Sequence, residues 1–265
     1  GDAMKVTIDD NSIYCYTNSR DIDSDKPSIV FIHGSGMDHT VWTLAARHFA
    51  RHGNNVIAVD LPGHGRSSGA PLQSIPAMAD WLEKVLNALK VDVTAVVGHS
   101  LGSLIALDFS ARYATRARAL VMVGTIVPMP VSGAILDACK SNDHAAYDML
   151  TQYGLSKRHQ YGGNRSSGIW MVGSSLRLYE RSQPGALYYD MNACNEYQSG
   201  LDRASAVECP VLMVLGSEDR LTPVRGTGPL QEAFHKLEVS VLQGAGHTLM
   251  MEAPNALLDA LHRAL

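Results

Sequence analysis

Short apolar runs alternate with amphipathic segments along most of the chain. Runs rich in Val, Ile and Leu predict buried strands, and the apolar spacing between them follows the helical period. Continuous apolar strands that alternate with helices are typical of a parallel sheet with helices on both faces. The expected strands are 28–32, 55–59, 94–97, 119–123, 211–215 and 238–242. The expected helices are 41–51, 75–89, 101–113, 229–235 and 256–264.

Two regions depart from this alternation. Residues 5–8 and 12–16 predict an antiparallel hairpin at one edge of the sheet. Residues 126–201 carry helical patterns without a strand signal, which is too long for a plain loop. We therefore expect an α/β core domain formed by 4–125 and 202–265, with 126–201 inserted as a helical lid.

Composition excludes several classes of protein. The formal net charge is −4, and charged residues make up 18% of the chain. A mildly acidic chain lacks the excess of basic residues that would indicate binding to nucleic acid or to an anionic membrane. The uncharged stretch 119–136 is interrupted by Pro128 and Pro130, so it predicts a buried strand and a loop rather than a membrane span. Four widely spaced cysteines predict free thiols in a reducing, cytoplasmic compartment. We expect a monomer or homodimer.

The segment Gly98-His99-Ser100-Leu101-Gly102 lies between an expected strand and an expected helix. Small residues at both ends allow a tight turn that exposes the central serine at the N-terminus of the helix. Such a serine is a candidate nucleophile, although an ordinary glycine-bounded turn would have the same sequence.

A serine nucleophile requires a base and a carboxylate. His247 follows a glycine-rich loop after the last expected strand, at the carboxyl end where open α/β folds place their sites. Asp219 follows the preceding strand and is the expected acid, with Glu218 as its rival. A satisfied loop histidine and a solvated acidic turn are the alternatives.

An oxyanion hole needs two backbone donors. Ser35 N–H, in the glycine-rich turn after the first expected core strand, and Leu101 N–H are the expected pair, with Gly36 as the alternative to Ser35. The phosphate-binding motifs GxGxxG and GxxxxGK(S/T) are both absent from the sequence, so a phosphate-binding loop is disfavoured.

Five motifs in this order resemble the α/β-hydrolase superfamily, in its lid-bearing branch of small serine hydrolases. They are HGSG at 33–36, DLPGHGRS at 60–67, GHSLG at 98–102, GSEDRLTP at 216–223 and GAGHTLMMEAP at 244–254. The resemblance covers 4–126 and 201–265, and implies Ser100 as nucleophile, Asp219 as acid and His247 as base. Ser103 stands where the family often has glycine.

These residues predict a serine hydrolase that cleaves a small carboxylic ester or related acyl compound through an acyl-enzyme. We expect neither a metal nor a cofactor in the reaction. Relatives with this triad also cleave C–C bonds in dienone acids, and a non-catalytic ligand-binding protein is the second alternative. A lid arginine facing the oxyanion hole would favour C–C cleavage. The arginines of the expected lid are Arg158, Arg165, Arg177 and Arg181.

The lid also carries side chains that could form an apolar pocket, although stripes of Met and aromatic residues are more often core. The candidate substrate-binding residues are Met37, Met129, Trp170, Met171, Tyr188, Tyr189 and Met191.

Overall fold

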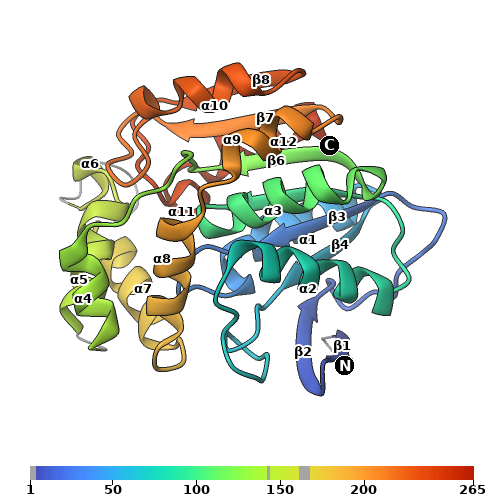
Figure 1. Ribbon diagram of the computed structural model, residues 1–265, viewed down its shortest axis with the longest axis horizontal. Coiled ribbons are helices and arrows are strands. Elements are labelled where there is room, and N and C mark those ends of the chain that lie inside the picture. Colours follow the sequence, from blue (N-terminus) through green and yellow to red (C-terminus); the bar gives the residue numbers. More distant parts are fainter. Residues whose placement is uncertain (1–3, 142–143, 161–167) are drawn as a thin grey trace.

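An eight-stranded, mostly parallel sheet lies at the centre of the computed structural model, which describes residues 4–141, 144–160 and 168–265 (Figure 1). The strand order is β1-β2-β4-β3-β5-β6-β7-β8. The β1–β2 hairpin lies at one edge of the sheet and is antiparallel, β2 pairs with β4 in antiparallel fashion, and all other pairs are parallel. The strands are β1 (Met4–Ile8), β2 (Asn11–Tyr16), β3 (Ser28–Ile32), β4 (Asn55–Val59), β5 (Thr94–His99), β6 (Ala117–Val123), β7 (Val211–Gly216) and β8 (Leu237–Leu242).

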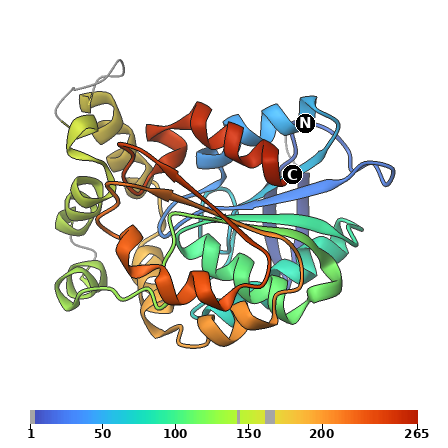
Figure 2. The same cartoon turned by 90° about the horizontal axis from the view of Figure 1, so that it is seen from above.

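Helices cover both faces of the sheet, as Figure 2 shows from above. Because successive strand residues point to opposite faces, Val30 and Ile32 of β3 belong to one apolar cluster while Ile29 and Phe31 belong to the other. The first face packs against α2 (Ile75–Ala88), α3 (Leu101–Arg112), α9 (Gly200–Ala206) and α10 (Gly228–Ala233). The second face packs against α1 (Thr43–Arg51) and α12 (Pro254–Ala264). The predicted fold class is confirmed.

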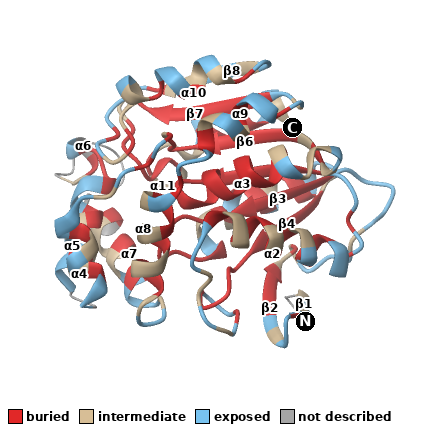
Figure 3. Ribbon diagram, in the orientation of Figure 1, coloured by how far each residue is buried: buried red, intermediate tan, exposed pale blue. Residues whose placement is uncertain are grey.

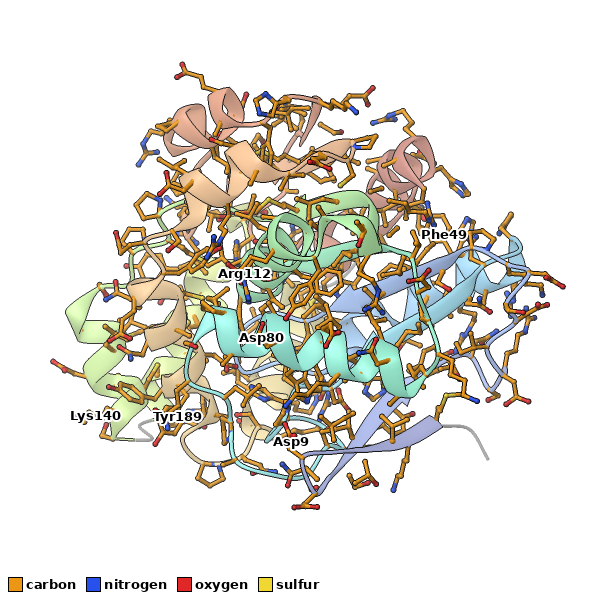
Figure 4. All side chains as sticks on the ribbon, turned by 45° about the vertical axis from the view of Figure 1, so that its right-hand side comes forward. Asp9, Phe49, Asp80, Arg112, Lys140 and Tyr189 are labelled. Atoms are coloured by element: carbon orange, nitrogen blue, oxygen red, sulfur yellow. The ribbon has the colours of Figure 1, made fainter. Side chains whose placement is uncertain are left out.

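Burial is concentrated on the central strands and on α3 (Figure 3). Ten residues of α3 are buried, among them Asp108. Its carboxylate accepts hydrogen bonds from Arg112 Nε at 2.8 Å, Arg203 Nε at 3.1 Å and Tyr197 Oη at 2.9 Å. Arg112 also pairs with Asp80 of α2, and both are labelled in Figure 4. A buried carboxylate is stable only when it is paired, which these hydrogen bonds achieve. Because the partners come from different elements, the network also joins α2, α3 and α9.

Between β6 and β7 the chain forms a helical segment at the carboxyl ends of the parallel strands (Figure 1). Its residues build a third apolar cluster with Met37 from the core. No helix within the described ranges has the length and apolar character that a membrane span requires. The helices of this segment are α4 (Gly133–Lys140), α5 (His144–Gly154), α6 (Lys157–Gln160), α7 (Gly168–Glu180) and α8 (Ala186–Glu196).

The ends of some elements differ from the expected ones for local reasons. The chain enters the helical conformation at His39 rather than at 41, because the Asp38 side chain caps Thr40 N–H at 2.9 Å. A 3₁₀ turn, η1 (His39–Trp42), therefore precedes α1. The other short elements are η2 (Ala114–Arg116), η3 (Val224–Gly226) and α11 (Leu249–Glu252).

Candidate active site

Ser100 occupies the sharp turn between β5 and α3. Its backbone has φ 56° and ψ −116°, a conformation that favours glycine and is strained for serine. The Ser100 N–H donates to Val123 O at 3.0 Å, which anchors the turn to β6. This hydrogen bond to the sheet helps to maintain the strained backbone conformation. It also keeps the Ser100 side chain at the carboxyl edge of the sheet.

Gly98 and Gly102 are required by close backbone approaches. A Cβ at Gly98 would lie 2.0 Å from Gly102 O, and a Cβ at Gly102 would lie 2.4 Å from Ile32 O. No side chain fits at either position without moving backbone. The spacing of the glycines thus follows from the packing of α3 against β5 and β3.

Asp219 and His247 meet although they lie on separate loops after β7 and β8. The His247 Nδ1–H donates to Asp219 Oδ2 at 2.8 Å, and both residues are buried. Thr222 Oγ1 donates to the same oxygen at 2.7 Å. The backbone N–H groups of Leu221 and Thr222 donate to Asp219 Oδ1. Every strong acceptor direction of the carboxylate is occupied.

Burial by itself would raise the pKa of the Asp219 carboxyl. The charge of His247 and the hydrogen bonds from His247 and Thr222 oppose this effect, and the pKa is lowered. Asp219 is thus ionised and directed at the imidazole. Its rival Glu218 is exposed, and its backbone N–H donates to Ala245 O at 2.9 Å.

Ser100 and His247 line the same cavity. The Ser100 hydroxyl points at Met129 Sδ, 4.0 Å away, and makes no hydrogen bond to His247 in the described part of the chain. In this structure the imidazole is thus hydrogen-bonded to the carboxylate but not to the serine hydroxyl. A hydrogen bond between Ser100 and His247 would require the hydroxyl to turn away from Met129 into another staggered rotamer.

The two candidate N–H donors in the turn after β3, those of Ser35 and Gly36, differ in whether they already have an acceptor. The Gly36 N–H donates to Asp190 Oδ2 at 2.8 Å, so it is already used. Ser35 lines the cavity, and its N–H has no protein acceptor among the described residues. The same holds for Leu101 N–H at the N-terminus of α3. The geometry thus favours Ser35 over Gly36 as a donor to a ligand in the cavity.

Asp190, on α8, forms a buried pair with His64 from the loop after β4. The His64 Nε2–H donates to Asp190 Oδ2 at 2.5 Å, and the Nδ1–H donates to Pro62 O at 2.9 Å. Because both nitrogens face acceptors, both carry protons and His64 is an imidazolium. Burial opposes this charge, but Asp190 outweighs burial and raises the pKa of His64. The pattern of apolar residues gave no signal for this pair.

The loop that carries His247 is also held by the α4–α8 segment. The His247 N–H donates to Gly154 O at 2.9 Å. Glu252 Oε1 accepts from Gly246 N–H at 3.2 Å and from Ser156 N–H at 2.8 Å. His159 Nδ1 lies 2.6 Å from the same oxygen. Glu252 lies within the last motif quoted above, so its position was visible in the sequence although its contacts were not.

The cavity has a volume of about 200 Å³ and a largely apolar wall. Met37, Met129 and Met191 line it, whereas Met171 and Tyr188 do not, and Tyr189 is likewise outside its wall. The side chain of Trp170 lies outside the described residues. Sequence reasoning missed these further lining residues: Pro130, Val131, Ser132, Ile135, Leu150, Tyr179, Cys194, Arg220, Leu221 and Thr222.

The arginines of this segment are placed away from the cavity where they are described. Arg181 Nη2 pairs with Asp38 at 3.1 Å, and Arg177 is exposed. Arg158, by its side chain, and Arg165 lie outside the described residues. The charged lining residue is instead Arg220, whose guanidinium donates to Gln152 O and Leu155 O.

One buried group has the composition of a metal site. Asp38, His39 and Asp60 bring their side-chain ligand atoms within 4.8 Å of one another. The Asp60 carboxylate, however, accepts from His39 N–H, His39 Nδ1–H and Arg66 N–H. Its lone pairs are therefore used within the chain, and the group stabilises loops rather than offering ligands.

Comparison with known proteins gives a consistent picture. The family model described as the alpha/beta hydrolase family matches residues 29–260. Esterase YbfF from Escherichia coli is 26% identical, with 89% of this chain and 92% of the relative covered. A pimeloyl-[acyl-carrier protein] methyl ester esterase from Aromatoleum aromaticum is also 26% identical, with 86% and 94% covered.

Solved structures share the fold. An N-acyl homoserine lactone degrading enzyme, Est816, has a TM-score of 0.83 at 24% identity and covers 99% of this chain and 100% of its own. The enol-lactonase from Burkholderia xenovorans LB400 has a TM-score of 0.86 at 15% identity, with 98% of each chain covered. The family match spans most of the chain, and the fold agrees with it. The chain belongs to the alpha/beta hydrolase family.

Proposed function

We propose that this protein is a serine hydrolase that cleaves a small carboxylic ester through an acyl-enzyme. The observation that carries the proposal is the buried Asp219–His247 pair, which shares a cavity with Ser100 on a strained turn. A carboxylate-bound imidazole beside a serine hydroxyl is the arrangement that activates a weak nucleophile.

The reaction begins when the Ser100 hydroxyl turns from Met129 toward His247. His247 Nε2 takes the proton as Oγ attacks the ester carbonyl, and Asp219 stabilises the imidazolium. The negative charge on the carbonyl oxygen is held by Ser35 N–H and Leu101 N–H. His247 then protonates the departing alcohol, which leaves the acyl group on Ser100. Water, deprotonated by His247, releases the acid and restores the serine.

Asp190 positions the oxyanion loop in this mechanism. Its carboxylate fixes Gly36 N–H at 2.8 Å while His64⁺ holds the carboxylate from the core. Fixing Gly36 also fixes the neighbouring Ser35, which lines the cavity and whose N–H has no protein acceptor among the described residues. Asp190 comes from α8, so the helical segment 126–201, proposed as a lid, contributes directly to the geometry of the core site.

The Asp190→Asn variant tests this role. We expect kcat to fall about 10²-fold with KM little changed, because a displacement of about 1 Å is enough to lose that factor. The wild-type folded pKa of His64 is raised, so the pair stabilises the fold fully below pH 6.5 and loses that contribution as the pH rises through the raised value. The wild-type advantage in urea unfolding is therefore expected to be larger at pH 6 than at pH 9. Equal kcat in the two proteins would contradict the positioning role.

The substrate is expected to have a short acyl chain. A cavity of about 200 Å³ lies below the roughly 300–1,000 Å³ of pockets for drug-sized ligands. The relatives with esterase names support ester cleavage. On a panel of aryl esters, we expect kcat/KM to fall about 5- to 150-fold from butyrate to decanoate, since overfilling a packed site costs about 1–3 kcal/mol. A rise toward decanoate would contradict the assigned acyl pocket.

Labelling tests the proposal as a whole. An organophosphonate is expected to attach to Ser100, as located by peptide mapping, and to abolish turnover of the ester panel. Absence of both labelling and ester turnover would refute the esterase. In that case, turnover of a dienone acid would support the C–C hydrolase alternative, and a thermal shift with ligand but without turnover would support a binding protein.

A further inference from the structure

Three histidines gather on the face of the sheet that carries α1 and α12. His48 lies in the last turn of α1, His52 follows as its C-cap, and His262 lies in the last turn of α12. Figure 2 shows the two helices side by side on this face. Residues four apart on a helix project from the same side, so His48 and His52 share the side that meets His262.

The rings are in mutual contact. His48 Nε2 and His262 Nε2 are 2.5 Å apart, with the ring planes at 81°. The His48 and His52 rings stack at 4.3 Å, and the His52 and His262 centroids are 5.7 Å apart. Phe49, labelled in Figure 4, packs against His48 and His262 and backs the cluster from the core side.

The hydrogen bonds decide which nitrogens carry lone pairs. The His52 Nδ1–H donates to His48 O at 2.7 Å, so in neutral His52 the Nε2 atom is a free base. Between His48 Nε2 and His262 Nε2 there is room for one proton only, so at least one of these atoms also carries a lone pair. The hydrogen-bond geometry thus leaves ring nitrogens with lone pairs, which are the atoms that bind metal.

We propose that His48, His52 and His262 form a binding site for one divalent transition-metal ion of the class that prefers imidazole, such as Zn²⁺, Ni²⁺ or Cu²⁺. The ion replaces the proton shared by His48 and His262. Metal–nitrogen bonds of about 2.0–2.1 Å at a tetrahedral angle place the two nitrogens about 3.3 Å apart, so small ring rotations suffice. His52 supplies the third nitrogen after its ring turns from the stack, and water completes the coordination.

The site joins α1 to the C-terminal helix and lies outside the wall of the Ser100 cavity. The ion therefore has no part in the ester chemistry proposed above, and the two proposals stand or fall separately. Its effect is on stability, because an ion that binds the folded chain and links two helices shifts the unfolding equilibrium.

The test uses the full chain without a polyhistidine tag, stripped with EDTA and titrated with ZnCl₂ against a chromogenic chelator at pH 7.5. We expect one ion per chain, and a Tm increase of about 5 °C at 100-fold excess over Kd. His262→Ala and His52→Ala are each expected to weaken binding at least about 10-fold. With Cu²⁺ in place of Zn²⁺, the electron paramagnetic resonance spectrum should show nitrogen ligands that are lost in His262→Ala.

His235→Ala is the matched control. His235 is also exposed, but its Nε2–H donates to Ser205 O, far in sequence from the cluster. This variant should bind Zn²⁺ like the wild type. If His262→Ala and His52→Ala bind as tightly as the wild type, or if His235→Ala loses as much affinity as they do, the site is refuted. An unchanged far-UV circular dichroism spectrum in all three variants confirms that folding is intact.

Discussion

Ser100→Ala is expected to lower kcat for a short-chain aryl ester by about 10⁶-fold, because without Oγ no acyl-enzyme forms. The organophosphonate label should be lost as well. Leu101 N–H and Ser35 N–H remain, so KM is expected to stay within a few-fold of the wild-type value. Steady-state kinetics and intact-mass analysis measure these effects. Activity and labelling that persist in a clean preparation would exclude Ser100 as the nucleophile.

Ser100→Gly separates loss of chemistry from loss of fold. Ser100 has φ 56° and ψ −116°, and glycine adopts this conformation without the steric strain that serine has there. We expect the glycine variant to be inactive but more stable than wild type by about 1 kcal/mol. Ser205→Ala, at an exposed position on α9, is the control and should match the wild type in activity and stability. A glycine variant less stable than Ser100→Ala would contradict a strained turn.

Much of the fold could be predicted because the strands of a parallel sheet are buried on both faces. Segments such as β3 and β7 are buried at every position and, apart from Ser28, carry no polar side chain, so their pattern is unambiguous. Ser100 was a clear candidate because its turn needs glycine two residues before and after it. The residues that such a turn requires are neighbours in the chain, so a sequence motif is enough to identify the turn.

Contacts between distant segments could not be predicted in the same way. Asp190 and His64 are far apart in the chain, and neither stands in a pattern that marks it as a partner of the other. The cavity wall depends on how α4–α8 pack, so Met171 and Tyr188 were indistinguishable from Met129 and Met191 before the structure was known. His48 and His262 likewise become neighbours only when α1 and α12 pack on the same face.

Asp219→Asn is expected to lower kcat by about 10⁴-fold, less than the loss of the nucleophile. The Asn amide would present a donor to His247 Nδ1, which favours the wrong tautomer and removes the charge that stabilises the imidazolium. KM should change little, because Asp219 is not part of the cavity wall. Glu218→Gln, at the exposed neighbouring carboxylate, is the matched control and should retain wild-type turnover.

The same variant has a pH signature. Because the folded pKa of Asp219 is lowered, its ionised form stabilises the fold above the unfolded value near 3.8 and loses this contribution as the pH falls through the folded value. The wild type should therefore exceed Asp219→Asn in free energy of unfolding at pH 7, and the difference should shrink in strong acid. Denaturant titrations at pH 7 and in strong acid measure this difference in the free energy of unfolding. A difference that grows on acidification would mean that Asp219 is not the ionised partner of His247, and the imidazole would then need another acid.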